Sequence, residues 1–173
     1  MQLITTKSLL TCASLLMAGI CFSASASAAE FRKLDGALPP ALTMTGLDGT
    51  RHELANYRGK VVLINFWASW CPPCREEMPS MQRLKQKLAN KPFAILAVAS
   101  GEDAQEAAAF IKRVKADFTV LPDPDAAVTK RWKVYGLPTS FLVDANGRLR
   151  YVLTGATEWD EAETVQRIES LYP

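Results

Sequence analysis

The chain has 173 residues, of which 49% are hydrophobic and 22% are charged, and its formal net charge is +2. This composition is typical of a globular protein. Because the net charge is small and no long basic or acidic run occurs, we expect no nucleic-acid partner, and charge says little about other partners. The length suits one domain, or one domain that follows a targeting segment.

The first thirty residues differ from the rest of the chain. Lys7 gives a positive start, residues 9–22 form an apolar run without charge, and residues 23–29 are all serine or alanine. This order is typical of a secretory signal peptide, and the small residues predict cleavage after Ala28 or Ala29. An uncleaved anchor is the alternative, but the run is short for a membrane span of roughly 20 residues.

Cleavage divides the chain into a signal peptide over residues 1–29 and a mature domain over residues 30–173, and it predicts a periplasmic location. Two of the four cysteines leave with the signal peptide, so Cys71 and Cys74 are the only ones in the mature domain. One pair provides no disulfide framework for the fold. We therefore expect its role to be chemical.

Strands and helices alternate along the mature domain. Residues 61–68 are nearly all apolar and rich in β-branched side chains, as in a central strand that is covered on both faces. Asp48-Gly49 and Asn146-Gly147 predict tight turns in two hairpins. The pattern predicts an α/β fold whose mixed central sheet has an extra N-terminal β-hairpin. In chain order we expect a hairpin over 41–54, a strand at 61–68, a helix that ends near 90, a strand at 93–99, a helix at 102–115, a strand at 118–121, a helix at 125–132, strands at 139–143 and 149–153, and a helix at 159–171 with Thr157 as its N-cap.

The strongest functional signal is the pair Cys71 and Cys74, placed where a strand ends and a helix begins. The free amides and the dipole of a helix N-terminus favour a thiolate on the first cysteine. A thiolate is the nucleophile in disulfide exchange. Cys71 can therefore attack a substrate disulfide, and Cys74, one turn along the helix, can resolve the mixed disulfide. The pattern predicts a redox-active centre.

Three other interpretations of the pair are weaker. A structural disulfide between these positions would close a very small loop and stabilise the fold little. A zinc site usually has four protein ligands, and His52 is the only other soft ligand in the mature domain. Two buried free thiols would not need two prolines between them at the start of a helix. We therefore expect neither a metal nor another bound cofactor.

Pro72 and Pro73 have a chemical consequence. Both suit the first turn of a helix, where a missing N–H costs nothing. Neither can donate to the Cys71 sulfur, so the amide of Cys74 is the first one able to do so. Weak stabilisation of the thiolate favours a reducing dithiol couple.

Three segments of the chain resemble the thioredoxin superfamily, and most closely its exported TlpA/ResA-like branch, which includes the thioredoxins of cytochrome c maturation. They are residues 59–75, residues 76–79 and residues 136–139, and the likeness extends from about Leu38 to the end of the chain. The resemblance implies a three-layer thioredoxin-like domain. It also implies a thiol–disulfide oxidoreductase that reduces disulfides of exported proteins and receives electrons from a membrane-bound, DsbD-like thiol donor.

The same resemblance assigns roles around the cysteines. Pro138 is expected to form a cis peptide bond and to face the active cysteines. Leu137 is expected to offer its backbone to an extended substrate peptide, as a strand adds to a sheet edge. Trp70 is expected to be a flat, partly exposed contact surface beside the disulfide.

Glu77 is the third candidate catalytic residue. It lies three residues after Cys74 and shares a helix face with it. A carboxylate there could exchange protons with Cys74, or it could simply complement the helix N-terminus. The resemblance favours proton transfer. Asn65 stands where cytoplasmic-type thioredoxins have a buried aspartate, and asparagine does not exchange protons. We expect Asn65 to satisfy backbone groups and Glu76 to stay solvated.

Two other functions compete with disulfide exchange. A peroxiredoxin-like peroxidase normally surrounds its cysteine with threonine and arginine and does not need Cys-x-x-Cys. A Sco-type copper-binding module needs a histidine in the second half of the domain, and none follows His52. Disulfide-containing proteins are the expected substrates and a monomer is the expected state. No residue identifies the client protein.

Overall fold

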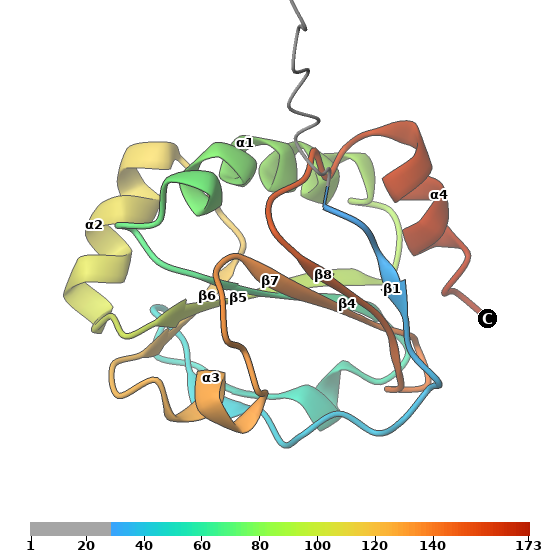
Figure 1. Ribbon diagram of the computed structural model, residues 1–173, viewed down its shortest axis with the longest axis horizontal. Coiled ribbons are helices and arrows are strands. Elements are labelled where there is room, and N and C mark those ends of the chain that lie inside the picture. Colours follow the sequence, from blue (N-terminus) through green and yellow to red (C-terminus); the bar gives the residue numbers. More distant parts are fainter. Residues whose placement is uncertain (1–28) are drawn as a thin grey trace, which may run out of the picture.

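The computed structural model describes residues 29–173, so most of the predicted signal peptide lies outside the described residues. Helices and strands alternate along these residues as the sequence predicts (Figure 1). Within them, no helix is both long and apolar enough to cross a membrane. The elements are β1 (Arg32–Lys33), β2 (Thr43–Thr45), β3 (Arg51–Glu53), the 3-10 turn η1 (Leu54–Tyr57), β4 (Val61–Trp67), α1 (Pro72–Lys87), β5 (Phe93–Ser100), α2 (Ala104–Val114), β6 (Thr119–Asp123), α3 (Ala127–Arg131), β7 (Thr139–Val143), β8 (Leu149–Thr154) and α4 (Ala162–Glu169).

The main sheet has six strands in the order β1-β8-β7-β4-β5-β6. Strands β4, β5 and β6 are parallel, whereas β7, β8 and β1 add antiparallel pairs. This confirms the mixed sheet. Strands β2 and β3 form the predicted N-terminal hairpin, paired apart from the main sheet. Its turn contains Gly49 at a φ of 76°, a conformation that glycine adopts without steric cost.

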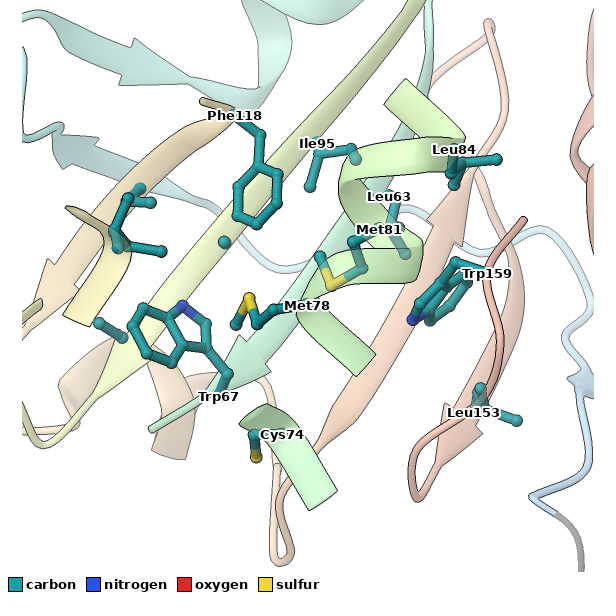
Figure 2. Close-up of a cluster of buried hydrophobic side chains, with 14 of the residues drawn as sticks. Leu63, Trp67, Cys74, Met78, Met81, Leu84, Ile95, Phe118, Leu153 and Trp159 are labelled. Atoms are coloured by element: carbon teal, nitrogen blue, oxygen red, sulfur yellow. The ribbon is translucent and has the colours of Figure 1, made fainter. Parts of the chain in front are cut away.

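Both faces of the sheet are covered, which explains why all seven residues of β4 are buried. Alternate residues of a strand point to opposite faces. Leu63 and Trp67 pack beneath α1, α2 and α4 (Figures 1 and 2), and Ile64 and Phe66 pack toward α3 and the β2–β3 hairpin. The result is the three-layer arrangement that was expected. Asn65 shares the face of Leu63 and Trp67, so its amide lies under α1.

Two helix starts differ from the sequence prediction. The last helix begins at Ala162 after Glu161, and neither Trp159 nor a Thr157 cap starts it. Residues 157–160 instead lie across α1. Helix α2 begins at Ala104 because the Asp103 side chain accepts hydrogen bonds from the amides of the first turn.

Strand β1 was not predicted. Its two residues pair with β8, with Arg32 opposite Val152 and Lys33 opposite Tyr151. Two residues are too few to show a periodic pattern, so only the neighbouring strand makes this segment recognisable as a strand.

Candidate redox site

The cysteine pair lies where β4 passes into α1. Cys71 is the N-cap of α1, with extended backbone angles, and Pro72 and Pro73 are the first two helical residues. Cys71 and Cys74 are joined in a disulfide. Cys71 is 4% exposed and Cys74 is fully buried. An approaching thiol or disulfide can therefore reach only the sulfur of Cys71.

One backbone amide serves the Cys71 sulfur. The N–H of Cys74 donates to Cys71 Sγ at a donor–acceptor distance of 3.4 Å. The two prolines before it have no N–H, and within residues 29–173 no other hydrogen bond reaches this sulfur. A single amide donor at the Cys71 sulfur is the arrangement that the two prolines predicted, and it favours a reducing couple.

The turn that leads to Cys71 is held by a residue that the sequence prediction missed. The N–H of Ser69 donates to Glu102 Oε1 at 2.6 Å, and Glu102 is only 3% exposed. Glu102 lies two residues after the end of β5, and the carboxyl ends of β4 and β5 meet at one sheet edge because the strands are parallel. The position of Glu102 just beyond β5 was the feature of the sequence that could have predicted this contact. Trp70, between the anchored serine and Cys71, is 69% exposed.

The 136–138 loop lies at the same end of the sheet. The Leu137–Pro138 peptide bond is cis, as the resemblance implied. Thr139, which follows it, pairs with Phe66 near the end of β4, so the loop ends beside the turn that leads to the cysteines. Leu137 is half-buried, and its backbone N–H and C=O have no hydrogen bond to another described residue. Tyr135, just before the loop, is 92% exposed.

Glu77 is buried in the face of α1 that lies against the sheet, with 1% exposure. Its two oxygens have different donors: Asn65 Nδ2 donates to Oε1 at 2.8 Å, and Trp159 Nε1 donates to Oε2 at 3.0 Å. Burial raises the pKa of Glu77 to about 7, although these hydrogen bonds oppose the rise. A carboxyl group that titrates near neutral pH can both accept and release a proton under physiological conditions.

The prediction that Asn65 satisfies backbone groups was wrong. Its side-chain amide donates to Glu77 and also to Ser140 Oγ, at 2.9 Å. The role of Trp159 was missed as well, because the residue was assigned to a helix start. Its nearest neighbours along the chain contain nothing that predicts a contact with Glu77, 82 positions away.

A cavity of about 340 Å³ lies between α1 and the segment before α4. Glu77, Glu76, Glu158 and Glu161 are among its lining residues. Glu76 is exposed, as expected.

Comparison with known proteins agrees with this geometry. Residues 28–170 match the model of the Redoxin family. The chain belongs to the redoxin family. ResA, a thiol-disulfide oxidoreductase of Geobacillus kaustophilus, is 36% identical over 138 residues, which cover 80% of this redoxin and 78% of the relative. The Bacillus subtilis ResA is 34% identical over 121 residues, covering 70% and 68% of the two chains.

A solved structure of a related protein supports the same family assignment. The crystal structure of a Chlorobium tepidum protein described as thiol:disulfide interchange protein DsbE has a TM-score of 0.73 and 34% identity, covering 80% of this redoxin and 97% of the other chain. This redoxin is therefore a TlpA/ResA-like member of the thioredoxin superfamily. It is a thiol–disulfide oxidoreductase that acts on disulfide-containing proteins.

Proposed function

We propose that this oxidoreductase is an exported protein disulfide reductase, with the Cys71–Cys74 dithiol as its working form. The single amide at the Cys71 sulfur supports this proposal most directly. A thiolate with few hydrogen-bond donors is stabilised weakly, so the reduced protein gives up its electrons readily. Substrates in cytochrome c maturation fit this role.

In the proposed reaction, the Cys71 thiolate attacks a client disulfide and forms a bond to one client sulfur, while the other leaves as a thiolate. Glu77 then takes the proton of Cys74. The Cys74 thiolate attacks the Cys71 sulfur, closes the intramolecular disulfide and releases the second client thiolate. Two electrons pass to the client, and the buried position of Cys74 keeps it from reacting with other disulfides.

Client binding is proposed at the loop end of the sheet. The N–H and C=O of Leu137 are free to pair with an extended peptide. Pro138 shapes the loop that presents them, and the exposed ring of Trp70 offers an apolar contact beside the disulfide. Recognition that uses mainly backbone groups suits a protein that must accept different client sequences.

The proposal includes export and recharging. Cleavage of residues 1–29 would deliver a mature domain over residues 30–173 to the periplasm, where thiols are normally oxidised. A reductase there needs a source of electrons, for which we propose a membrane-bound, DsbD-like thiol donor. The mature domain is proposed to act as a monomer.

Thiol trapping in living cells tests the direction of electron flow. Cells are quenched with acid, free thiols are alkylated with a maleimide that adds mass, and the envelope fraction is analysed by gel. We expect most of the protein to have Cys71 and Cys74 reduced, and to become oxidised when the membrane thiol donor is removed. A population that is fully oxidised in wild-type cells contradicts the proposal.

A further inference from the structure

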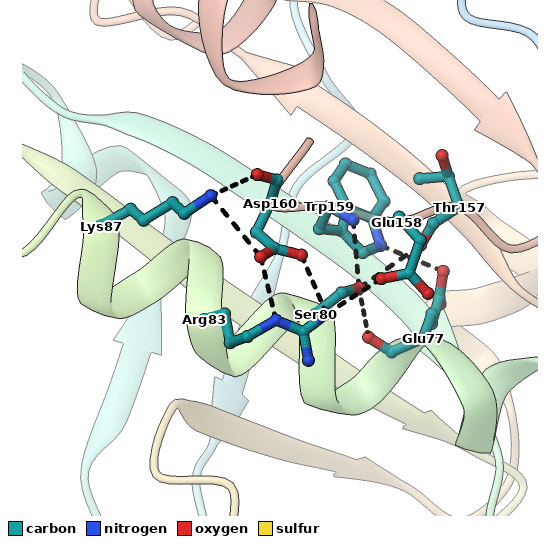
Figure 3. A network of polar contacts seen from close by, with 8 residues as sticks. All are labelled: Glu77, Ser80, Arg83, Lys87, Thr157, Glu158, Trp159 and Asp160. Atoms are coloured by element: carbon teal, nitrogen blue, oxygen red, sulfur yellow. Dashed lines mark hydrogen bonds and ion pairs between the residues drawn. The ribbon is translucent and has the colours of Figure 1, made fainter. Parts of the chain in front are cut away.

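The segment 157–160 crosses α1 along one line of side chains (Figure 3). Residues 77, 80, 83 and 87 are spaced three or four apart and therefore share a helix face. Ser80 is the central contact: its Oγ accepts from the N–H of Trp159 at 3.0 Å and donates to the carbonyl of Glu77 at 2.8 Å. The backbone of Trp159 is thus joined to the same turn of α1 that contains Glu77.

Charged contacts hold the next part of the segment. Arg83 binds both carboxylate oxygens of Asp160, at 2.9 and 3.0 Å, and also contacts Glu158 at 2.9 Å. Lys87 donates to the carbonyl oxygen of Asp160. Because the guanidinium of Arg83 binds the carboxylate of Asp160 at two points, it fixes the orientation of that carboxylate as well as its distance. The segment on both sides of Trp159 is therefore held against α1.

The Trp159 side chain itself has little freedom. It is fully buried and packs edge-on against Phe31, with ring centroids 5.9 Å apart. A buried indole N–H needs an acceptor, and here the acceptor is Glu77 Oε2. The contact between these two side chains is a consequence of how the whole segment is held.

We propose that Trp159 is a positioning residue of the redox reaction, whose indole N–H orients the Glu77 carboxylate and stabilises its ionised form. The inference rests on the proposed proton transfer between Glu77 and Cys74. An ionised Glu77 is required to accept the Cys74 proton. If the donor to Oε2 is lost, burial is opposed by the hydrogen bonds from Asn65 and from the Thr157 backbone without the contribution of Trp159, and the carboxyl group stays protonated to higher pH.

The other donors to the carboxyl group already contact it in the folded protein, so they do not stand in for the indole N–H. These donors are Asn65 on β4 and the backbone of Thr157, and the charged groups that line the adjacent cavity are Glu76 on α1 and Glu158 and Glu161 ahead of α4. Of the cations on this face of α1, Arg83 is engaged with Glu158 and Asp160, and Lys87 is engaged with Asp160.

The test replaces Trp159 by phenylalanine in the oxidised, full-length mature domain, which removes the N–H and keeps an aromatic ring. The carboxylic C=O stretch of Glu77, identified by its loss in Glu77→Gln, is followed by infrared spectroscopy from pH 5 to 10. We expect its midpoint to move up by about one pH unit, which corresponds to loss of one hydrogen bond to a charged group.

Trp132→Phe is the matched control. Trp132 is also buried, but it packs on the opposite face of the sheet, and its indole N–H has no partner among the described residues. This variant should leave the midpoint unchanged. If Trp159→Phe folds poorly, Arg83→Gln loosens the same segment from the surface and should move the midpoint in the same direction by less.

This experiment tests the role of Trp159 and the proton transfer by Glu77 separately. A Glu77 midpoint that is equal in wild type and Trp159→Phe overturns the role of Trp159, whatever happens to stability. The pH profile of disulfide exchange by the reduced protein should move with the infrared midpoint. If the midpoint moves and the exchange profile does not, the proposed proton transfer by Glu77 is wrong, and with it the place of Trp159 in the reaction.

Discussion

Replacing Glu77 with glutamine should make the stability of the protein depend less on pH. Burial raises the pKa of Glu77 from the ordinary 4.5 to about 7 in the folded state. Between these two values the folded protein binds a proton that the unfolded chain has released. The carboxyl group therefore contributes stability that is complete below pH 4.5 and is lost as the pH rises to about 7. At 1.36 kcal/mol per pH unit, the loss is about 3 kcal/mol.

Urea unfolding of the oxidised protein at pH 5 and pH 8 measures this effect, because the disulfide removes thiol titration from the comparison. Relative to Glu77→Gln, the wild type should lose about 2 to 3 kcal/mol of unfolding free energy between the two values. Glu76→Gln is the control, since its side chain is exposed. If wild type and Glu77→Gln lose stability in parallel, the native carboxyl group does not titrate near neutral pH and its assignment as a proton acceptor loses its basis.

Three further predictions concern single residues. Cys74→Ala should accumulate a mixed disulfide between Cys71 and its client, visible by mass spectrometry, whereas accumulation in Cys71→Ala and not in Cys74→Ala would contradict the order of attack. Asn65→Asp places a second carboxyl group within hydrogen-bonding reach of Glu77, so the pair should share a proton and the variant should lose most stability at pH 8 in urea unfolding. Asp123→Ala should lower the unfolding free energy by roughly 2 to 4 kcal/mol, because a buried carboxylate that accepts three hydrogen bonds at the start of α3 is removed. A loss below about 0.5 kcal/mol in thermal or chemical unfolding would show that these contacts matter little.

The features that the sequence predicts well are encoded locally. The strand at Val61–Trp67 is a continuous apolar run, and both hairpins have an Asp-Gly or Asn-Gly turn between short strands. The cysteine pair is equally local, since two cysteines and two prolines at the start of a helix already specify which sulfur is accessible.

The features that were missed depend on contacts between distant segments. Strand β1 exists only through its pairing with β8. The residues before α4 have a helical composition, but the contacts of Trp159 and Asp160 with α1 hold them outside the helix. Asn65 could be placed on the α1 side of the sheet from alternation along the strand. Its partner, however, is known only once α1 is packed on β4.

The reduction potential of the Cys71–Cys74 couple tests the central claim most directly. The mature domain is equilibrated with glutathione or dithiothreitol buffers of defined potential, and its redox state is followed by fluorescence or by alkylation of the thiols. We predict a potential near that of thioredoxin, about −270 mV, because a single amide stabilises the Cys71 thiolate. A value near about −120 mV would identify an oxidant that makes disulfides, and it would contradict both the reductase function and the role assigned to the two prolines.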